Sequence, residues 1–218
     1  MNNSNGDFMQ DSILARLRDL VPKRRMTYAE SLRIAELQAN RLLEILNVSG
    51  PLVPNEIVTE LPRVEVRYEN DLPVSGSAHW EHGRWIITLN ASEAYVRRRF
   101  SLMHEFKHVL DHPTKRSLYG DTTDDYGAAA RAERAADVFA AALLMPKRWL
   151  KGLWFTHHQN LPVVANRLQV STRALSVRLW HLGLGVETPR CARSSDSYQP
   201  TSDVETYFRS TPLAGVSP

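Results

Sequence analysis

Cysteine is almost absent from this chain of 218 residues, in which Cys191 is the only one. A single cysteine excludes a disulfide within the chain and a zinc site built from several thiolates. Any metal site must therefore be built from histidine and carboxylate side chains. Sparse cysteine also suits a reducing compartment, so we expect a cytoplasmic protein.

Long apolar runs are missing as well. No stretch approaches the roughly 18 consecutive apolar residues of a membrane span, and the longest candidate, 138–145, has the length of a core helix. The first seven residues, MNNSNGD, lack the basic segment and apolar run of a secretory signal. We expect no membrane partner. The net charge of +3 and the pI of about 9.1 are a mild basic bias, which does not by itself establish nucleic-acid binding.

The most informative motif is His104-Glu105-Phe106-Lys107-His108. Four residues separate the two histidines, so on a helix they lie on one face about one turn apart and can hold one Zn²⁺ through their imidazole nitrogens. A carboxylate at Glu105 can take a proton from a metal-bound water and deliver it to a leaving amine. This arrangement is typical of metalloproteases.

A helix from about residue 92 to 112 is predicted around this motif, with Asn90 and Glu93 as its capping box and Pro113 ending it. Apolar residues form two rows on it: Leu102, Phe106 and Val109 in one, and Val96, Phe100, Met103 and Leu110 in the other. A helix buried on two sides needs partners for its histidines. The alternative to metal binding is a pair of core histidines that bond to backbone carbonyls.

A third metal ligand must come from elsewhere, because catalytic zinc usually has three protein ligands and a water. His112 lies roughly 6 Å beyond His108 along the helix axis, too far for one ion on an unbroken helix. Glu133 is the better candidate, since Asp137 one turn later can accept the free N–H of a ligand histidine. A solvated Glu and Asp on an exposed face is the alternative, and Asp124 or Asp125 is a fallback ligand.

The remaining pattern predicts an α+β fold of the zincin type: a small, mostly antiparallel three-stranded sheet packed on helices. Strands are expected at 64–68, 75–80 and 85–90, the last two forming a hairpin. Helices are expected at 28–46, 55–61 and 128–145. Two more, with a turn near residues 169–171, are expected within 161–184.

The stretches 99–108 (RFSLMHEFKH) and 136–146 (ADVFAAALLMP) together resemble the ImmA/IrrE family of metallo-endopeptidases, over about residues 30–185. The resemblance implies a zinc peptidase that cuts a helix-turn-helix transcriptional repressor and so takes part in stress responses or in releasing a mobile element. It also implies His104, His108 and Glu133 as metal ligands and Glu105 as general base. Three positions depart from the family pattern: Lys107 replaces a usual glycine, Asp111 an apolar residue, and Ala135 a second glutamate.

The predicted organisation is an N-terminal extension with a short helix (1–27), a metallopeptidase domain (28–187) and a disordered tail (188–218). Within the domain, 161–184 is a helical lobe that also fits a helix-turn-helix DNA reader, with Arg173 and Arg178 on its second helix. Non-cleaving regulation through DNA or a partner, or a role in a toxin–antitoxin pair, therefore stays open. Zn²⁺ is the expected cofactor, although Mn²⁺ or Fe²⁺ can occupy a His/His/Glu site.

Overall fold

The structure is a computed structural model that describes residues 13–120 and 126–185. The predicted tail at 188–218, residues 1–12 of the N-terminal extension and the fallback ligands Asp124 and Asp125 lie outside the described residues. The fold is α+β, with a three-stranded sheet packed on helices, as the sequence predicts. No helix within 13–120 and 126–185 has the length and apolar character needed to cross a bilayer.

The sheet consists of β1 (Val64–Glu69), β2 (Gly76–Glu81) and β3 (Arg84–Asn90), in the order β1-β3-β2. β2 and β3 form the predicted antiparallel hairpin, whose turn uses the positive φ angles of His82 (45°) and Gly83 (83°). β1 pairs with β3 in parallel, so the sheet is mixed rather than mostly antiparallel. The hairpin occupies one side of β3, which leaves only the other side for β1. β2 is consequently an edge strand.

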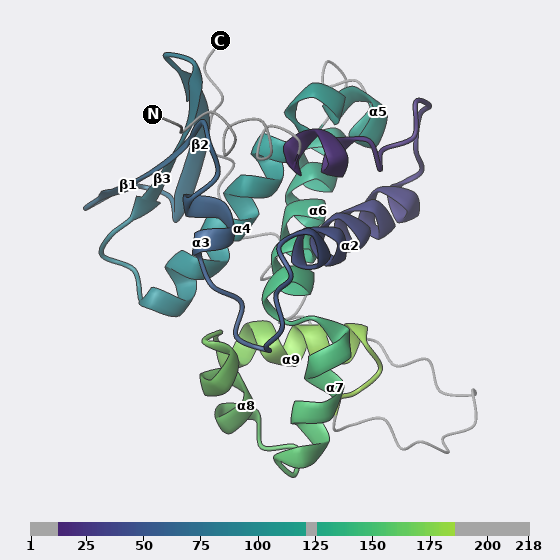
Figure 1. Cartoon of the computed structure of the whole chain (residues 1–218), viewed down its shortest axis with the longest axis vertical. Coiled ribbons are helices and arrows are strands. Elements are labelled where there is room, and N and C mark those ends of the chain that lie inside the picture. The colour runs from purple at the N-terminus through teal and green to yellow at the C-terminus, as the bar shows by residue number, and fades with distance from the viewer. Residues whose placement is uncertain (1–12, 121–125, 186–218) are drawn as a thin grey trace, which may run out of the picture.

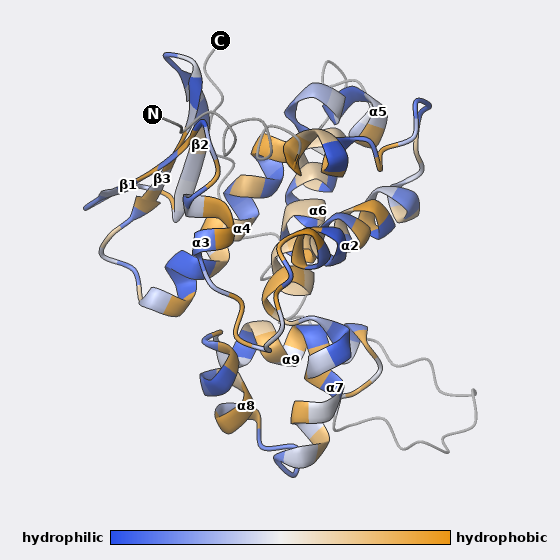
Figure 2. Ribbon diagram, in the orientation of Figure 1, coloured by the Kyte–Doolittle hydropathy of each residue, from blue (hydrophilic) through white to orange (hydrophobic). Residues whose placement is uncertain are grey.

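Three long helices follow one another away from the sheet (Figure 1): α4 (Tyr95–Asp111) packs against it, then come α6 (Tyr126–Leu144) and α2 (Tyr28–Ile45). α4 contacts β2 and β3 on one side and α6 on the other, and α6 in turn contacts α2. α6 is rich in buried alanines, which let its neighbours approach closely, and Figure 2 shows it pale to orange along most of its length. The histidine helix is thus held between the sheet and α6.

The beginning of α4 differs from the prediction. Its N-cap is Ala94, and no side chain caps the helix. The Asn90 side chain instead accepts hydrogen bonds from the Ser92 backbone N–H and hydroxyl and donates to the Leu72 carbonyl. The capping box predicted at Asn90 is therefore wrong, because the turn after β3 needs that side chain. The capping box that the structure contains joins Thr27 and Glu30 at the start of α2.

Shorter helices complete the fold. They are residues 13–18 near the N-terminus, α3 (Glu56–Thr59), η1 (His112–Thr114), α5 (Lys115–Tyr119), α7 (Lys147–Thr156), α8 (Leu161–Leu168) and α9 (Thr172–His181). α8 ends at Gln169 in the left-handed conformation, and the Ser171 side chain caps α9 by accepting from the Ala174 N–H. The two helices and turn predicted at 161–184 are therefore present. α7, α8 and α9 form a lobe below α6 in Figure 1.

Arg99 ties this lobe to the histidine helix. The guanidinium, on α4 and only 2% exposed, donates to the carbonyls of Leu168 and Gln169 in the α8–α9 turn. It also donates to the Val53 carbonyl and to the Asn55 side chain. Burying a guanidinium is costly unless its N–H groups have partners, and here the partners come from two separate segments. α4, the loop before α3 and the α8–α9 turn are therefore fixed to one another.

Lys107 and Asp111, two of the departures from the family pattern, form a pair with each other. The Lys107 side chain is fully buried and donates to the carboxylate of Asp111, one turn along α4, and to Gln38 on α2. The Tyr119 hydroxyl donates to the second oxygen of Asp111. Lysine at this position therefore stays inside the protein and does not extend to solvent. A buried ion pair replaces the close packing that glycine and an apolar residue would give.

Candidate metal centre

Three side chains from two helices converge at the middle of α4. The Nε2 atoms of His104 and His108 lie 3.1 Å apart. Glu133, on α6, places one carboxylate oxygen 3.1 Å from His104 Nε2 and the other 3.3 Å from His108 Nε2. Among the described residues, this is the group of His, Cys, Asp and Glu side chains whose ligand atoms are close enough to share one metal ion.

The distances suit a small divalent cation. Four ligands at the roughly 2.0–2.1 Å bond lengths of zinc, in a tetrahedron, are separated by about 3.3–3.4 Å. The three observed separations, 3.1, 3.1 and 3.3 Å, are close to that value. Two imidazoles and a carboxylate leave one position for a water, as catalytic zinc requires. The Glu133 side chain is 43% exposed, so the centre is open to solvent on that side.

Asp137 supports the centre from one turn further along α6. Its Oδ1 lies 2.9 Å from His104 Nδ1, the ring nitrogen that points away from the ligand cluster. Burial alone would lower the pKa of His104, but hydrogen bonds with Asp137 and Glu133 raise it to about 10. Burial opposes ionisation of Glu133, yet hydrogen bonds from His104 and His108 hold its pKa below the usual range. The cluster is therefore organised to hold positive charge.

Glu105 lies on the sheet side of α4. Burial raises the pKa of this carboxyl, an effect that the nearby His104 and His108 oppose and the Glu133 charge reinforces. The contact with the sheet is Gly76, at the start of β2: a Cβ atom there would lie 3.1 Å from Glu105 Cγ. Gly76 was not predicted as a functional residue. An isolated glycine at the start of a strand is a known signal of close approach by another group, and it was available in the sequence.

Other candidates from the sequence lie away from the cluster. His112 caps the end of α4 and stacks edge-on against Trp85 of β3, with ring centroids 5.0 Å apart. His79 and His82 lie on the exposed hairpin near Glu81. The Tyr119 hydroxyl is buried and donates to Asp111. His157 and His158 follow the end of α7, and no contact joins them to the ligand cluster.

Comparison with known proteins gives a family for the chain. The family model described as the IrrE N-terminal-like domain, of peptidase family M78, matches residues 60–180, more than half of the sequence. The chain belongs to this family. The match spans β1 to α9 and includes His104, His108 and Glu133. Membership shows a zincin-like metallopeptidase fold, while no curated protein matches the chain.

A solved structure has the same fold. A Mycobacterium tuberculosis transcriptional regulator superposes with a TM-score of 0.56 at 16% sequence identity. The match covers 82% of this chain and 53% of the regulator's chain, so our chain corresponds to about half of that structure. At this identity the similarity shows the fold only.

Proposed function

We propose that this member of the IrrE-like family is a metal-dependent endopeptidase, which hydrolyses a peptide bond in a protein substrate with Glu105 as general base. One observation carries the proposal: His104, His108 and Glu133 present their ligand atoms 3.1–3.3 Å from one another. Zinc is the cation proposed, with Mn²⁺ or Fe²⁺ as alternatives for this donor set. Asp137 fixes the ring of His104 by accepting its Nδ1–H.

A zinc ion at the cluster would act as a Lewis acid toward a water and toward the scissile carbonyl. Glu105 then accepts a proton from the attacking water and later delivers it to the leaving amine. Burial raises the pKa of the Glu105 carboxyl in the metal-free protein, so its carboxylate is a stronger base there than an exposed glutamate. Glu133 and the histidines stay fixed by the packing of α4 against α6.

The substrate is proposed to bind extended along β2. β2 is an edge strand of the sheet, and its first residue, Gly76, touches Glu105. An extended peptide can add to such an edge through backbone hydrogen bonds, which places its amides beside the general base. From the family resemblance, the proposed substrate is a helix-turn-helix transcriptional repressor. The similarity in fold to a transcriptional regulator is compatible with a regulatory setting.

The test of this function uses Glu105→Gln, which keeps the size of the side chain but cannot accept a proton. Wild type and variant, both loaded with zinc, are incubated with a mixture of peptides from a bacterial proteome, and new termini are identified by mass spectrometry. We expect cleavage by the wild type and at least about a hundredfold less by Glu105→Gln, at equal zinc content. Equal cleavage by the two proteins would remove Glu105 from the mechanism.

A second candidate function, contact with duplex DNA, is favoured by charge. The sequence from 138 to 185 contains no Asp or Glu, and its basic residues are Lys147, Arg148, Lys151, Arg167, Arg173 and Arg178. Of the two arginines predicted to contact DNA, Arg173 is exposed, but Arg178 is buried and pairs with Glu36 at 2.7 Å. Duplex binding that weakens steeply with salt and ignores a metal chelator would support this function.

A further inference from the structure

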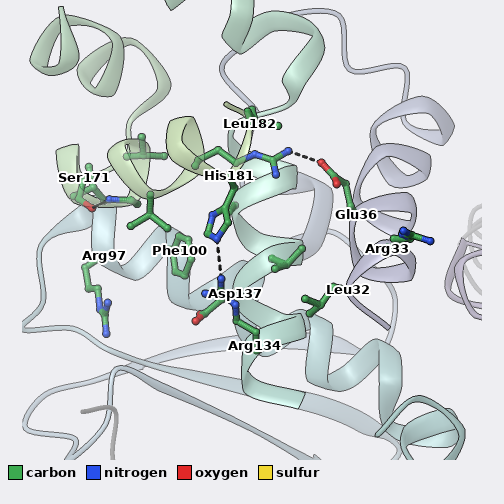
Figure 3. A pocket seen from close by; sticks show the side chains of 17 residues that line it. Leu32, Arg33, Glu36, Arg97, Phe100, Arg134, Asp137, Ser171, His181 and Leu182 are labelled. Atoms are coloured by element: carbon green, nitrogen blue, oxygen red, sulfur yellow. Dashed lines mark hydrogen bonds and ion pairs between the residues drawn. The ribbon is translucent and has the colours of Figure 1, made fainter. Parts of the chain in front are cut away.

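A groove lies where α9 crosses α2, α4 and α6 (Figure 3). It has a volume of about 240 Å³ and a mainly apolar floor, including Phe100 on α4, Val138 on α6 and Val177 on α9. All three side chains are only partly buried, so the apolar surface is reachable from outside. A volume of this size fits one large aliphatic or aromatic side chain with its adjoining backbone.

The groove adjoins the metal centre. Asp137 lines it and also pairs with His104 Nδ1 at 2.9 Å. On α4, Phe100 of the groove lies one helical turn before His104. Arg97, also in the lining, donates to the hydroxyl of Ser75, the residue immediately before β2. The groove therefore lies on the side of the His104 ring away from the ligand cluster, joined to that ring by Asp137 and to the start of the edge strand by Arg97 and Ser75.

The charge around the groove is mostly positive. Arginines line it from all four helices: Arg33 on α2, Arg97 on α4, Arg134 on α6 and Arg178 on α9. The acidic residues in the lining are Glu36, which pairs with Arg178 at 2.7 Å, and Asp137, which pairs with His104. Arg134 donates to His181 at 2.8 Å, which keeps that ring nitrogen free of a proton. Arg97 also lies 3.8 Å from Glu93, outside the lining, so four arginines face three carboxylates. The remaining positive charge at the rim favours a carboxylate.

We propose that this groove selects the substrate: it receives a large apolar side chain of the bound polypeptide near the scissile bond, and the arginines favour an acidic residue next to it. The proposal rests on the proposed peptidase function, because the bound polypeptide is its substrate. It adds the side-chain class that the site prefers. Two observations support a peptide over other occupants. The groove shares Asp137 with the proposed metal centre, and four arginines line it.

The test measures peptide binding to zinc-loaded Glu105→Gln by fluorescence anisotropy. The probes are labelled ten-residue Gly/Ser peptides with a central Leu-Glu, Leu-Lys or Ala-Glu pair. We expect Leu-Glu to bind about tenfold tighter than Ala-Glu, since burying the larger side chain is favourable. Leu-Glu should also bind about threefold tighter than Leu-Lys at low salt, with the difference shrinking as salt is added.

Matched variants assign these preferences to the groove. Val177→Trp fills it and should abolish the preference for leucine, whereas Ser176→Trp, on the exposed side of the same helix, should preserve it. Arg33→Glu should reverse the preference for glutamate over lysine. Arg41→Glu, two turns along α2 and outside the groove, should not.

Several results would overturn the proposal: no binding of any probe, equal affinity for the three peptides, or Val177→Trp binding like wild type. A dimer that Val177→Trp disrupts without changing peptide affinity would assign the groove to a second copy of the chain. A different result would remove the proposed peptidase function. Selective peptide binding by a wild-type protein that cuts nothing would leave the groove assignment standing and remove catalysis.

Discussion

Gly76 shows how much one residue can contribute to placing Glu105, the proposed general base. A methyl group at this position would lie 3.1 Å from Glu105 Cγ and 3.2 Å from Leu89 Cδ2. Both distances are shorter than ordinary van der Waals contacts, so either Glu105 or β2 must move. Misplacing a general base by a fraction of an ångström lowers the rate without removing the metal.

Gly76→Ala is therefore expected to lower kcat by about tenfold to a hundredfold, which corresponds to roughly 1.4–2.7 kcal/mol of barrier. Zinc content should stay at the wild-type level, because no metal ligand is touched. Steady-state kinetics beside metal analysis make the measurement. Gly152→Ala, on α7 with open space around the new methyl group, is the matched control and should leave kcat unchanged. A normal kcat in Gly76→Ala would show that the contact does not position Glu105.

The protonation of His104 predicts how many protons are released when zinc binds. In the metal-free protein its pKa is raised to about 10, so below that pH the ring carries an extra proton. Zinc binding needs a neutral imidazole and must displace that proton. We expect about one proton released per zinc at pH 7.5 and progressively fewer as the pH rises through 10. Calorimetry in buffers with different ionisation enthalpies measures this number.

The variant Asp137→Asn tests which group raises the pKa of His104. The Asp137 carboxylate gives the larger of the two hydrogen-bond contributions that raise the pKa of His104, so the variant should release fewer protons at pH 7.5. Zinc binding with no proton release in the wild type would contradict the protonated state of His104.

At the scale of elements, the position of α4 depends on a buried ion pair. Lys107 and Asp111 join α4 to Gln38 on α2 and to Tyr119 on α5, within a region where all four side chains are buried. Removing one member leaves the other charge buried without its partner, which typically costs about 3–5 kcal/mol. Apolar replacement of both members removes that penalty.

Lys107→Met and Asp111→Leu are accordingly each expected to lower the free energy of unfolding by about 3–5 kcal/mol. The double variant should lose less than the sum of the two single losses, by about 1–3 kcal/mol. Urea denaturation followed by circular dichroism gives all four values. Additive losses would mean that the two side chains do not interact in the folded protein.

The elements predicted best from the sequence are those whose pattern lies within a single segment. The i, i+4 spacing of His104 and His108 and the Glu133/Asp137 spacing each require only that their own segment is a helix. The predicted cap at Asn90 failed because the competing partners, Ser92 and Leu72, depend on how the chain turns after β3. The parallel direction of β1 likewise depends on the path of the chain between β1 and β3, which no pattern within one strand contains.

At the scale of the whole molecule, the missed features all join segments distant in sequence. The groove uses side chains from four helices, and Gly76 and Glu105 are separated by the β2–β3 hairpin, the turn after β3 and half of α4. Periodicity in one segment carries no information about such neighbours. The burial of Lys107 was unexpected for the same reason, since Gln38 and Tyr119 become visible as partners only in the folded chain.

The account depends on one cation shared by α4 and α6. The most direct measurement is the zinc content of purified wild type beside Glu133→Ala, after dialysis against a weak chelator and with folding checked by circular dichroism. We predict one zinc per wild-type chain and less than about a tenth of that in Glu133→Ala, because two histidines alone bind zinc weakly. Equal zinc in both proteins, or none in a folded wild type, would contradict the metal centre and the hydrolytic function proposed from it.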